Sequence, residues 1–242
     1  MQTKWLDVRT ADGTMRSYLA TPDGDGPYPG VVVLQEAFGV NEYVRSVADR
    51  LADAGFVALA PELFHRLGNH VELAYDAGPK ILEHMVALTN DTLEEDTGAA
   101  VAALRARHDV DPKRIGALGF CMGGFTAILA GLTTAVGAVV AFYPGGLVAS
   151  RPPINMQPLV DRMPKLKAAT LLQFGADDKS ISPADIELVK QAMAQSQARY
   201  EVDVYPDAGH GFHSHDRASA FAPEAAEAAW HRTLTWLRDM LA

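Results

Sequence analysis

The chain contains a single residue of the type that makes a strong sulfur nucleophile, and glycines stand close on both sides of it. Cys121 is the only cysteine among 242 residues, and it lies in the segment GFCMGG at 119–124, directly after an apolar run. A lone cysteine is usually a small residue of the core. A nucleophile on a tight turn between a strand and a helix, however, needs glycines two residues before and after it, because larger side chains would collide with the neighbouring backbone. The segment therefore predicts a nucleophile elbow, in which the backbone N–H of Met122 is one donor to an oxyanion.

Carboxylates and a histidine follow the expected elbow in the chain order nucleophile, acid, histidine. Asp177 and Asp178 come shortly after one later apolar run, and His210 comes shortly after the next. Parallel strands end at one edge of a sheet, and open α/β sheets place their sites at that edge. We therefore expect Cys121, His210 and one of the two aspartates to form a triad. Asp207 is a third candidate for the acid, but it is too close in sequence to His210 to orient the ring easily.

Continuous apolar runs alternate with helical periodicities along most of the chain, which is typical of a mainly parallel sheet covered by helices. An opening hairpin is expected, and Asn41 and Ser182 are expected to cap two of the helices. The expected strands are 4–9, 14–20, 31–34, 56–60, 115–120, 137–142, 170–174 and 200–205. The other expected helices are 80–88, 92–107, 125–132 and 218–241. These elements predict one α/β domain over residues 1–242, with about eight strands and helices on both faces of the sheet.

The composition limits the classes of partner. The formal net charge is −9, whereas binding to nucleic acid or to an anionic membrane requires clustered Lys and Arg. No run approaches the ~20 apolar residues of a membrane span, and the N-terminus has no apolar stretch long enough for a signal peptide. One cysteine cannot form an internal disulfide, so nothing indicates an oxidising compartment. We expect a cytoplasmic protein that binds neither nucleic acid nor membranes.

Several segments together resemble the dienelactone hydrolase family, a cysteine-nucleophile branch of the α/β-hydrolases, over essentially the whole chain. The pair of QEAFGVN at 35–41 and GFCMGG at 119–124 is the specific part of this resemblance. The segments at 60–64, 175–181 and 209–212 also fit many other α/β-hydrolases. The resemblance implies the α/β-hydrolase fold and selects Asp178 as the acid, with Asp177 as second choice. It also implies a monomer.

The resemblance further implies the carboxymethylenebutenolidase type of chemistry on a small lactone or ester substrate. Cys121 would attack the carbonyl and form an acyl-thioester, while His210 would act as base and then as acid. Asp178 would hold the histidine tautomer and stabilise the imidazolium. The N–H groups of Ala37 and Met122 would hold the oxyanion. Water would then hydrolyse the acyl-enzyme, so neither a metal nor another cofactor is expected.

Glu36 has two interpretations. A carboxylate at the end of a buried strand is costly unless it is paired or protonated, so a nearby arginine or backbone N–H could satisfy it. In the family this glutamate lies beside the cysteine and helps to control the thiol's proton until substrate binds. By the resemblance, Glu36 therefore belongs to the catalytic group.

The contacts to substrate are less well defined by the sequence. Family members that open dienelactone hold its carboxylate with two arginines, one of them four residues beyond the catalytic histidine, where this chain has Ser214. Residues 62–90 leave the regular pattern and are expected to form a pocket wall or lid. The candidates for substrate contacts are Phe38, His213 and Arg66, with Lys80 and Arg151 as further cations.

Two other hypotheses compete with the hydrolase. The run HGFHSH at 210–215 could hold a metal, but zinc sites draw three or four ligands with supporting carboxylates, and this loop already carries the expected triad histidine. Alternatively, Cys121 could be a redox-sensing or ligand-binding thiol on a non-catalytic hydrolase fold. A thiol sensor needs neither Asp178 nor His210, so the presence of both favours the enzyme.

Overall fold

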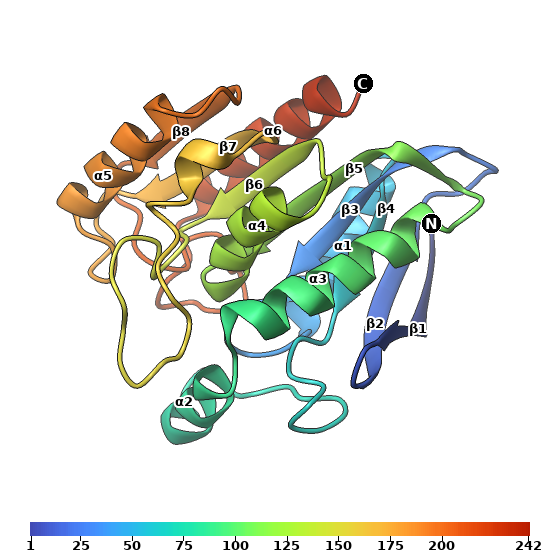
Figure 1. The fold of residues 1–242 in the computed structure, drawn as a ribbon, viewed down its shortest axis with the longest axis horizontal. Coiled ribbons are helices and arrows are strands. Elements are labelled where there is room, and N and C mark those ends of the chain that lie inside the picture. The colour runs from blue at the N-terminus through green and yellow to red at the C-terminus, as the bar shows by residue number, and fades with distance from the viewer.

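One eight-stranded sheet runs through the protein (Figure 1), whose computed structural model describes all 242 residues. The strand order is β1-β2-β4-β3-β5-β6-β7-β8. Strands β3 to β8 are parallel, while β1 and β2 form the expected antiparallel hairpin at one edge. The strands are β1 Gln2–Thr10, β2 Gly13–Thr21, β3 Tyr28–Leu34, β4 Val57–Pro61, β5 Val110–Phe120, β6 Ala138–Phe142, β7 Ala169–Gly175 and β8 Tyr200–Tyr205.

The chain forms six α-helices, and helices cover both faces of this sheet (Figure 1). Helices α3 and α4 pack against each other in front of the sheet in Figure 1, and α1 and α6 lie behind it. The guanidinium of Arg50 in α1 lies 4.1 Å from the ring centroid of Trp230 in α6, which joins the two helices of the rear layer. The helices are α1 Glu42–Asp53, α2 Gly78–Val86, α3 Asn90–Arg105, α4 Met122–Thr133, α5 Pro183–Ala194 and α6 Pro223–Met240. None of them is long and apolar enough to cross a membrane.

The apolar runs that predicted the central strands are buried on both faces of the sheet. Every residue of β4 and β6 is buried, and so is the 31–34 run of β3. Strands covered by helices on both sides need continuous rather than alternating apolar residues, which explains why these runs could be recognised. The capping predictions are also confirmed, because Asn41 Oδ1 accepts from the N–H of Val44 and Ser182 Oγ accepts from that of Asp185.

The two largest differences from the predicted element boundaries are at the starts of α6 and β5. Helix α6 begins at Pro223 rather than near 218, because the N–H of Ala222 donates to the carbonyl of Phe212 and holds the preceding residues in a loop. Strand β5 begins at Val110 rather than at 115. Its first part meets β3 only where Val110 opposes Tyr28, and regular pairing starts at Ile115 after a register shift.

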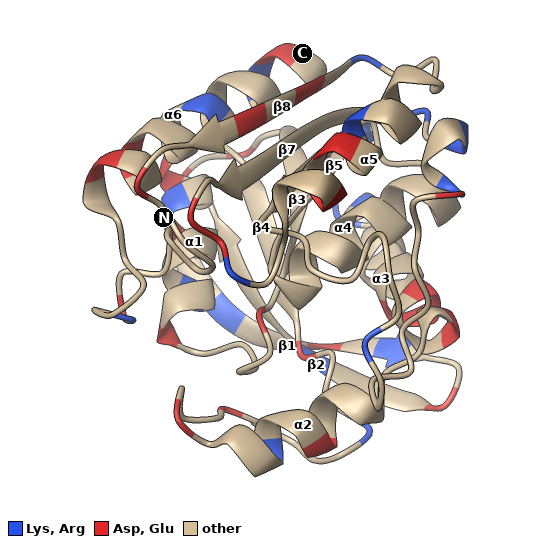
Figure 2. Cartoon of the chain, turned by 90° about the vertical axis from the view of Figure 1, so that its left-hand side faces the viewer, with Lys and Arg blue, Asp and Glu red and all other residues tan.

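Residues 62–90 leave the sheet and return through α2, which stands apart from the sheet in Figure 2. The N–H of Leu73 donates to the carbonyl of Phe38, and Gly39 forms an isolated bridge with Glu72. On its far side, the side-chain amide of Asn155 donates to the carbonyl of Val86. Hydrogen bonds near the middle and near the end of this excursion therefore join it to the loops that follow strands β3 and β6.

Candidate active site

Cys121 occupies a strained turn between β5 and α4. Strand β5 ends at Phe120, α4 begins at Met122, and Cys121 has φ 53° and ψ −114°, which non-glycine residues rarely adopt. A Cβ on Gly119 would lie 2.0 Å from the carbonyl oxygen of Gly123, and one on Gly123 would lie 2.1 Å from that of Leu34. Only glycine fits at these two positions, so the strand–turn–helix predicted from GFCMGG is present.

The structure pairs His210 with Asp178. His210 Nδ1 lies 2.7 Å from Asp178 Oδ2, and the aspartate side chain is fully buried. Asp178 Oδ1 accepts from the N–H groups of Ser180, at 2.6 Å, and Ile181, at 3.2 Å. Asp177 and Asp207 are exposed and form no ion pair with His210. Of the three carboxylates considered, only Asp178 is placed to orient the imidazole.

The charge of His210 depends on Cys121. Burial of the ring disfavours the imidazolium, but attraction to the Cys121 sulfur and the hydrogen bond to Asp178 outweigh burial and raise the pKa of His210 to about 10. With Nδ1 directed to Asp178, Nε2 remains for the sulfur. The sulfur of Cys121 and the ring of His210 therefore interact electrostatically.

We expect His210 to remain protonated up to about pH 10 in the resting protein, and Cys121→Ala to lower the midpoint of its titration. A histidine whose pKa is raised by folding stabilises the protein fully below its unfolded pKa of about 6.5, and the effect is lost as the pH rises through the folded pKa. NMR titration of the imidazole in the two proteins measures the shift, and an unchanged midpoint would show that sulfur and ring do not interact.

Two backbone N–H groups near Cys121 donate to no acceptor within the protein. Met122 is the first residue of α4, so its N–H has no carbonyl of the preceding turn to donate to. The N–H of Ala37, in the loop directly after β3, donates to no backbone or side-chain acceptor. Strands β3 and β5 are neighbours in the sheet and pair Leu34 with Gly119, so the loops that carry these groups begin side by side.

Glu36 is a buried carboxyl with little compensation. It is 1% exposed, and neither of its oxygens accepts a hydrogen bond. The nearest cation is Arg217, whose Nη1 lies 3.9 Å from Glu36 Oε1. Burial raises the pKa of Glu36, whereas the charges of Arg217 and His210 and the nearby hydroxyl of Tyr143 act in the opposite direction. Burial has the larger effect, which favours the protonated acid, and a protonated carboxyl is able to carry a proton.

We expect Glu36→Gln to change the reactivity of the Cys121 thiol more than it changes stability. A carboxyl whose pKa is raised by folding destabilises the protein increasingly as the pH rises above its unfolded value, and an amide of the same shape removes that dependence. The free energy of unfolding should change by no more than about 1 kcal/mol near neutral pH. The rate of thiol alkylation should shift along the pH axis because a neighbouring proton carrier is lost. An alkylation profile identical to that of the wild type would remove Glu36 from the reaction.

Two expectations about substrate contacts need correction. His213 is 2% exposed, its Nδ1 lies 2.6 Å from the hydroxyl of Tyr43, and its ring stacks on Phe120. Burial, with the charges of Arg50 and His215, lowers its pKa to about 3, so the ring is neutral. His213 is thus part of the aromatic core, and its side chain is not open to a substrate.

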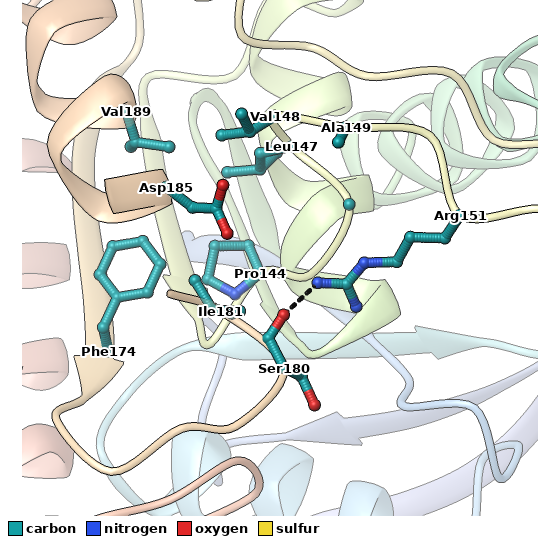
Figure 3. Close-up of a pocket in the computed structure, with 11 residues that line it drawn as sticks. Pro144, Leu147, Val148, Ala149, Arg151, Phe174, Ser180, Ile181, Asp185 and Val189 are labelled. Carbon is teal, nitrogen blue, oxygen red and sulfur yellow. Dashed lines mark hydrogen bonds between the residues drawn. The ribbon is translucent and has the colours of Figure 1, made fainter. Parts of the chain in front are cut away.

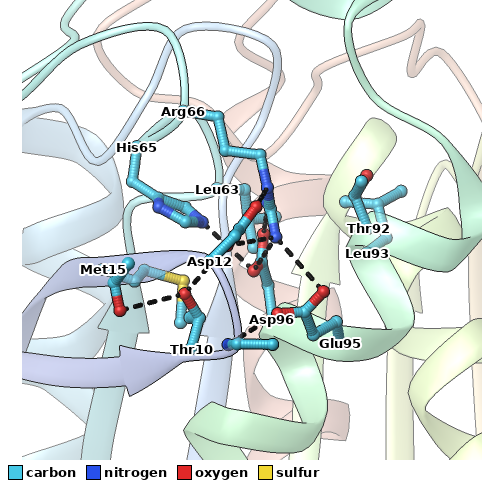
Figure 4. Close-up of polar contacts among 12 residues, drawn as sticks. Thr10, Asp12, Met15, Leu63, His65, Arg66, Thr92, Leu93, Glu95 and Asp96 are labelled. Atoms are coloured by element: carbon cyan, nitrogen blue, oxygen red, sulfur yellow. Dashed lines mark hydrogen bonds and ion pairs between the residues drawn. The ribbon is translucent and has the colours of Figure 1, made fainter.

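Arg66 is occupied by carboxylates elsewhere (Figure 4). Its Nε lies 2.5 Å from Asp12 and its Nη1 2.7 Å from Asp96, which is fully buried and also contacted by His65 at 3.1 Å. Asp12 is in the turn of the β1–β2 hairpin and Asp96 is in α3. Arg66 therefore links the β1–β2 hairpin to α3, and its guanidinium is not available to a substrate.

An arginine that the sequence analysis did not consider lies beside the site. The guanidinium of Arg217 is 5.3 Å from the ring centroid of Phe38 and 5.5 Å from that of Tyr75, and it is the cation nearest to Glu36. A Cβ on Gly211, which has φ 84°, would lie 2.5 Å from Arg217 Nη1. In the family an arginine lies four residues beyond the histidine, where this chain has Ser214. Here the loop after His210 continues to Pro223, and it folds back at Arg217. Phe38 is 9% exposed and packs edge-on against Tyr75.

The thiol opens onto a narrow pocket of about 50 Å³. Met85 of α2 is one of its walls, so the 62–90 excursion reaches the site as expected. The other residues around the pocket are mostly apolar: Met122, Gly145, Gly146, Ala149, Arg151, Ile154 and Met156. The histidines at 210–215 do not converge there, because His210 pairs with Asp178, His213 with Tyr43 and His215 with Asp216. The pocket therefore suits a short uncharged group beside Cys121.

A mainly parallel sheet with a strained elbow after β5, followed by an acid and a histidine after β7 and β8, defines the α/β-hydrolase fold. The chain belongs to the dienelactone hydrolase family, whose sequence profile matches residues 15–241. It is therefore a hydrolase of that family.

Three similar proteins agree with this assignment. A candidate carboxymethylenebutenolidase of Synechocystis sp. is 34% identical over 96% of this chain and 94% of its own length. A candidate 2-oxo-3-(5-oxofuran-2-ylidene)propanoate lactonase of Bradyrhizobium sp. is 35% identical over 97% and 93%. The crystal structure of a candidate dienelactone hydrolase from Klebsiella pneumoniae superposes with a TM-score of 0.88, at 32% identity over 98% of both chains.

Proposed function

We propose that this protein hydrolyses lactones or small esters with Cys121 as the nucleophile, through an acyl-thioester intermediate. One observation carries the proposal: His210 is hydrogen-bonded to the buried Asp178, and attraction to the Cys121 sulfur raises the pKa of its ring. A thiol at the tip of an elbow becomes a nucleophile when a histidine takes its proton and a carboxylate orients that histidine.

The proposed reaction has two halves. The Cys121 sulfur, with its proton on His210 Nε2, adds to the carbonyl carbon, and the N–H groups of Ala37 and Met122 hold the oxyanion that forms. Collapse of this tetrahedral species breaks the C–O bond, and His210 gives its proton to the departing alkoxide. Water then adds to the thioester while His210 takes a proton from it, and release of the carboxylic acid regenerates Cys121. Loss of one oxyanion donor usually costs ~3 kcal/mol of transition-state stabilisation.

The substrate class follows from the pocket and from the names of the relatives. The relatives are named as a butenolidase and as a lactonase, which supports a lactone. The pocket beside Cys121 has room for a short acyl group and is mostly apolar. Arg217, stacked on Phe38 and Tyr75, is the cation placed to attract a carboxylate on such a substrate once Glu36 is protonated.

Intact-protein mass spectrometry during turnover tests the proposal, with dienelactone and a short activated aryl ester offered separately. We expect an added acyl mass with at least one of the two compounds, and its disappearance as product accumulates. An adduct from dienelactone alone would indicate that the anionic group is recognised and would make Arg217 the first residue to substitute. A folded protein that gives neither adduct nor product with either compound would contradict the proposal and favour the thiol-sensor hypothesis.

A further inference from the structure

A second cavity lies directly behind the pocket of Cys121. It has a volume of about 200 Å³, four times the 50 Å³ of the thiol pocket, and is bounded by the loop after β6, the end of β7 and helix α5 (Figure 3). The two spaces share three wall residues, Gly146, Ala149 and Arg151. A common wall this small means that one side chain can decide whether they are separate or continuous.

Arg151 is the only one of the three shared residues with a side chain long enough to separate the two spaces. Its Nη2 donates a hydrogen bond to the carbonyl of Ser180, which also borders the larger cavity (Figure 3). A Cβ built on Gly145, which lines the thiol pocket, would lie 2.9 Å from Arg151 Nη1, so the guanidinium rests on that backbone. Arg151 is exposed and forms no ion pair, and one hydrogen bond to a carbonyl is its only polar attachment. The partition can therefore be displaced at small cost.

The larger cavity is suited to a hydrocarbon chain. Its interior is formed by Leu147, Val148, Phe174, Ile181 and Val189. The one carboxylate in its wall, Asp185, already accepts hydrogen bonds from the N–H and hydroxyl of Ser182. Arg151 and Asp185 are the only charged residues in the wall, so an entering chain would meet mainly apolar side chains and gain by leaving water.

We propose that Arg151 is a movable partition that sets the acyl-chain specificity of this site, and that the cavity behind it accepts the tail of acyl groups of about six to eight carbons. The inference rests on the proposed hydrolysis through Cys121. The chain is assigned to the acyl group rather than to the alcohol because the acyl group stays on the sulfur between the two halves of the reaction.

The experiment compares kcat/KM for p-nitrophenyl acetate, butanoate, hexanoate and octanoate in the wild type and in Arg151→Ala. We expect the wild type to favour the two short esters, and Arg151→Ala to raise the octanoate-to-acetate ratio about tenfold. The substitution removes the hydrogen bond that a long chain must otherwise break, and the loss of one such bond accounts for roughly two- to tenfold. Arg199→Ala, which removes an exposed arginine that borders neither cavity, is the matched control and should leave the ratio unchanged.

A second substitution keeps the test specific to the cavity. Val148 borders the larger cavity but not the thiol pocket, so Val148→Phe added to Arg151→Ala should return the ratio to within about twofold of the wild type. If the wild type hydrolyses acetate but Arg151→Ala leaves the ratio within twofold, the partition is refuted and the hydrolase remains. If the wild type hydrolyses none of the esters or lactones tested, the proposed function and this inference fail together.

Discussion

Cys121→Ala should abolish turnover of every lactone or ester that the wild-type protein hydrolyses, lowering kcat/KM by at least about a thousandfold. The sulfur is the only group in the proposed reaction that forms a covalent bond to the substrate. Without it, the oxyanion N–H groups can still bind and polarise a carbonyl, which leaves only the modest catalysis typical of triads stripped of their nucleophile. Steady-state kinetics and the mass of the protein during turnover both report the loss, because the acyl adduct must disappear with the activity.

Cys121→Gly provides a matched control for folding. Both variants lack the sulfur, so both must be inactive, but glycine tolerates the φ of 53° that strains any other residue at this turn. The glycine variant should therefore not be less stable than the alanine variant in thermal unfolding. Residual hydrolysis in either variant, at a rate near that of the wild type, would show that another residue attacks the carbonyl and that Cys121 is only a neighbour of the site.

The parts of the site that depend on local backbone chemistry were predictable from the sequence. The glycines around Cys121 indicate a close approach of backbones, and the structure shows the Cβ positions of Gly119 and Gly123 filled by carbonyl oxygens. Buried parallel strands are continuous apolar runs, so the strand ends that carry Asp178 and His210 could be located. The sequence alone could not separate Asp177 from Asp178. The two aspartates are adjacent in one turn, and the sequence does not show which side chain points inward.

The parts that depend on distant partners were not predictable. His213 has the type and position of a ligand or substrate contact, but its partner Tyr43 lies 170 residues earlier. By sequence, Arg66 is a possible cation for the pocket. In the structure it is paired with Asp12 and Asp96, which lie 54 and 30 residues away. Arg217 was overlooked because the loop that returns it to Phe38 has no periodic pattern. In each case the sequence allows the polar side chain several partners, and only the tertiary structure shows which one it contacts.

Asp178→Asn should lower kcat/KM by about ten-thousandfold, a loss typical of a triad in which the histidine is held in the wrong tautomer. Asp178 Oδ1 accepts from the N–H groups of Ser180 and Ile181, so Oδ2 is the oxygen that faces His210. In the asparagine variant the amide oxygen must stay with these two donors, because the NH2 group cannot accept from them. The NH2 group would then face His210 Nδ1, making that nitrogen an acceptor and placing the ring proton on Nε2. A ring already protonated at Nε2 cannot take the proton of the Cys121 thiol.

Asp177→Asn is the matched control, since it makes the same chemical change one residue earlier at an exposed position with no contact to His210. Its kcat/KM should stay within about threefold of the wild type. Titration of the imidazole checks the lost contact, because Asp178→Asn should lower the pKa of His210 from about 10 by removing one of the two partners that raise it, and thermal unfolding checks that the variant is still folded. If Asp177→Asn instead caused the large loss, the loop after β7 would have to rearrange on substrate binding, and the geometry of the resting triad would not be that of the reaction.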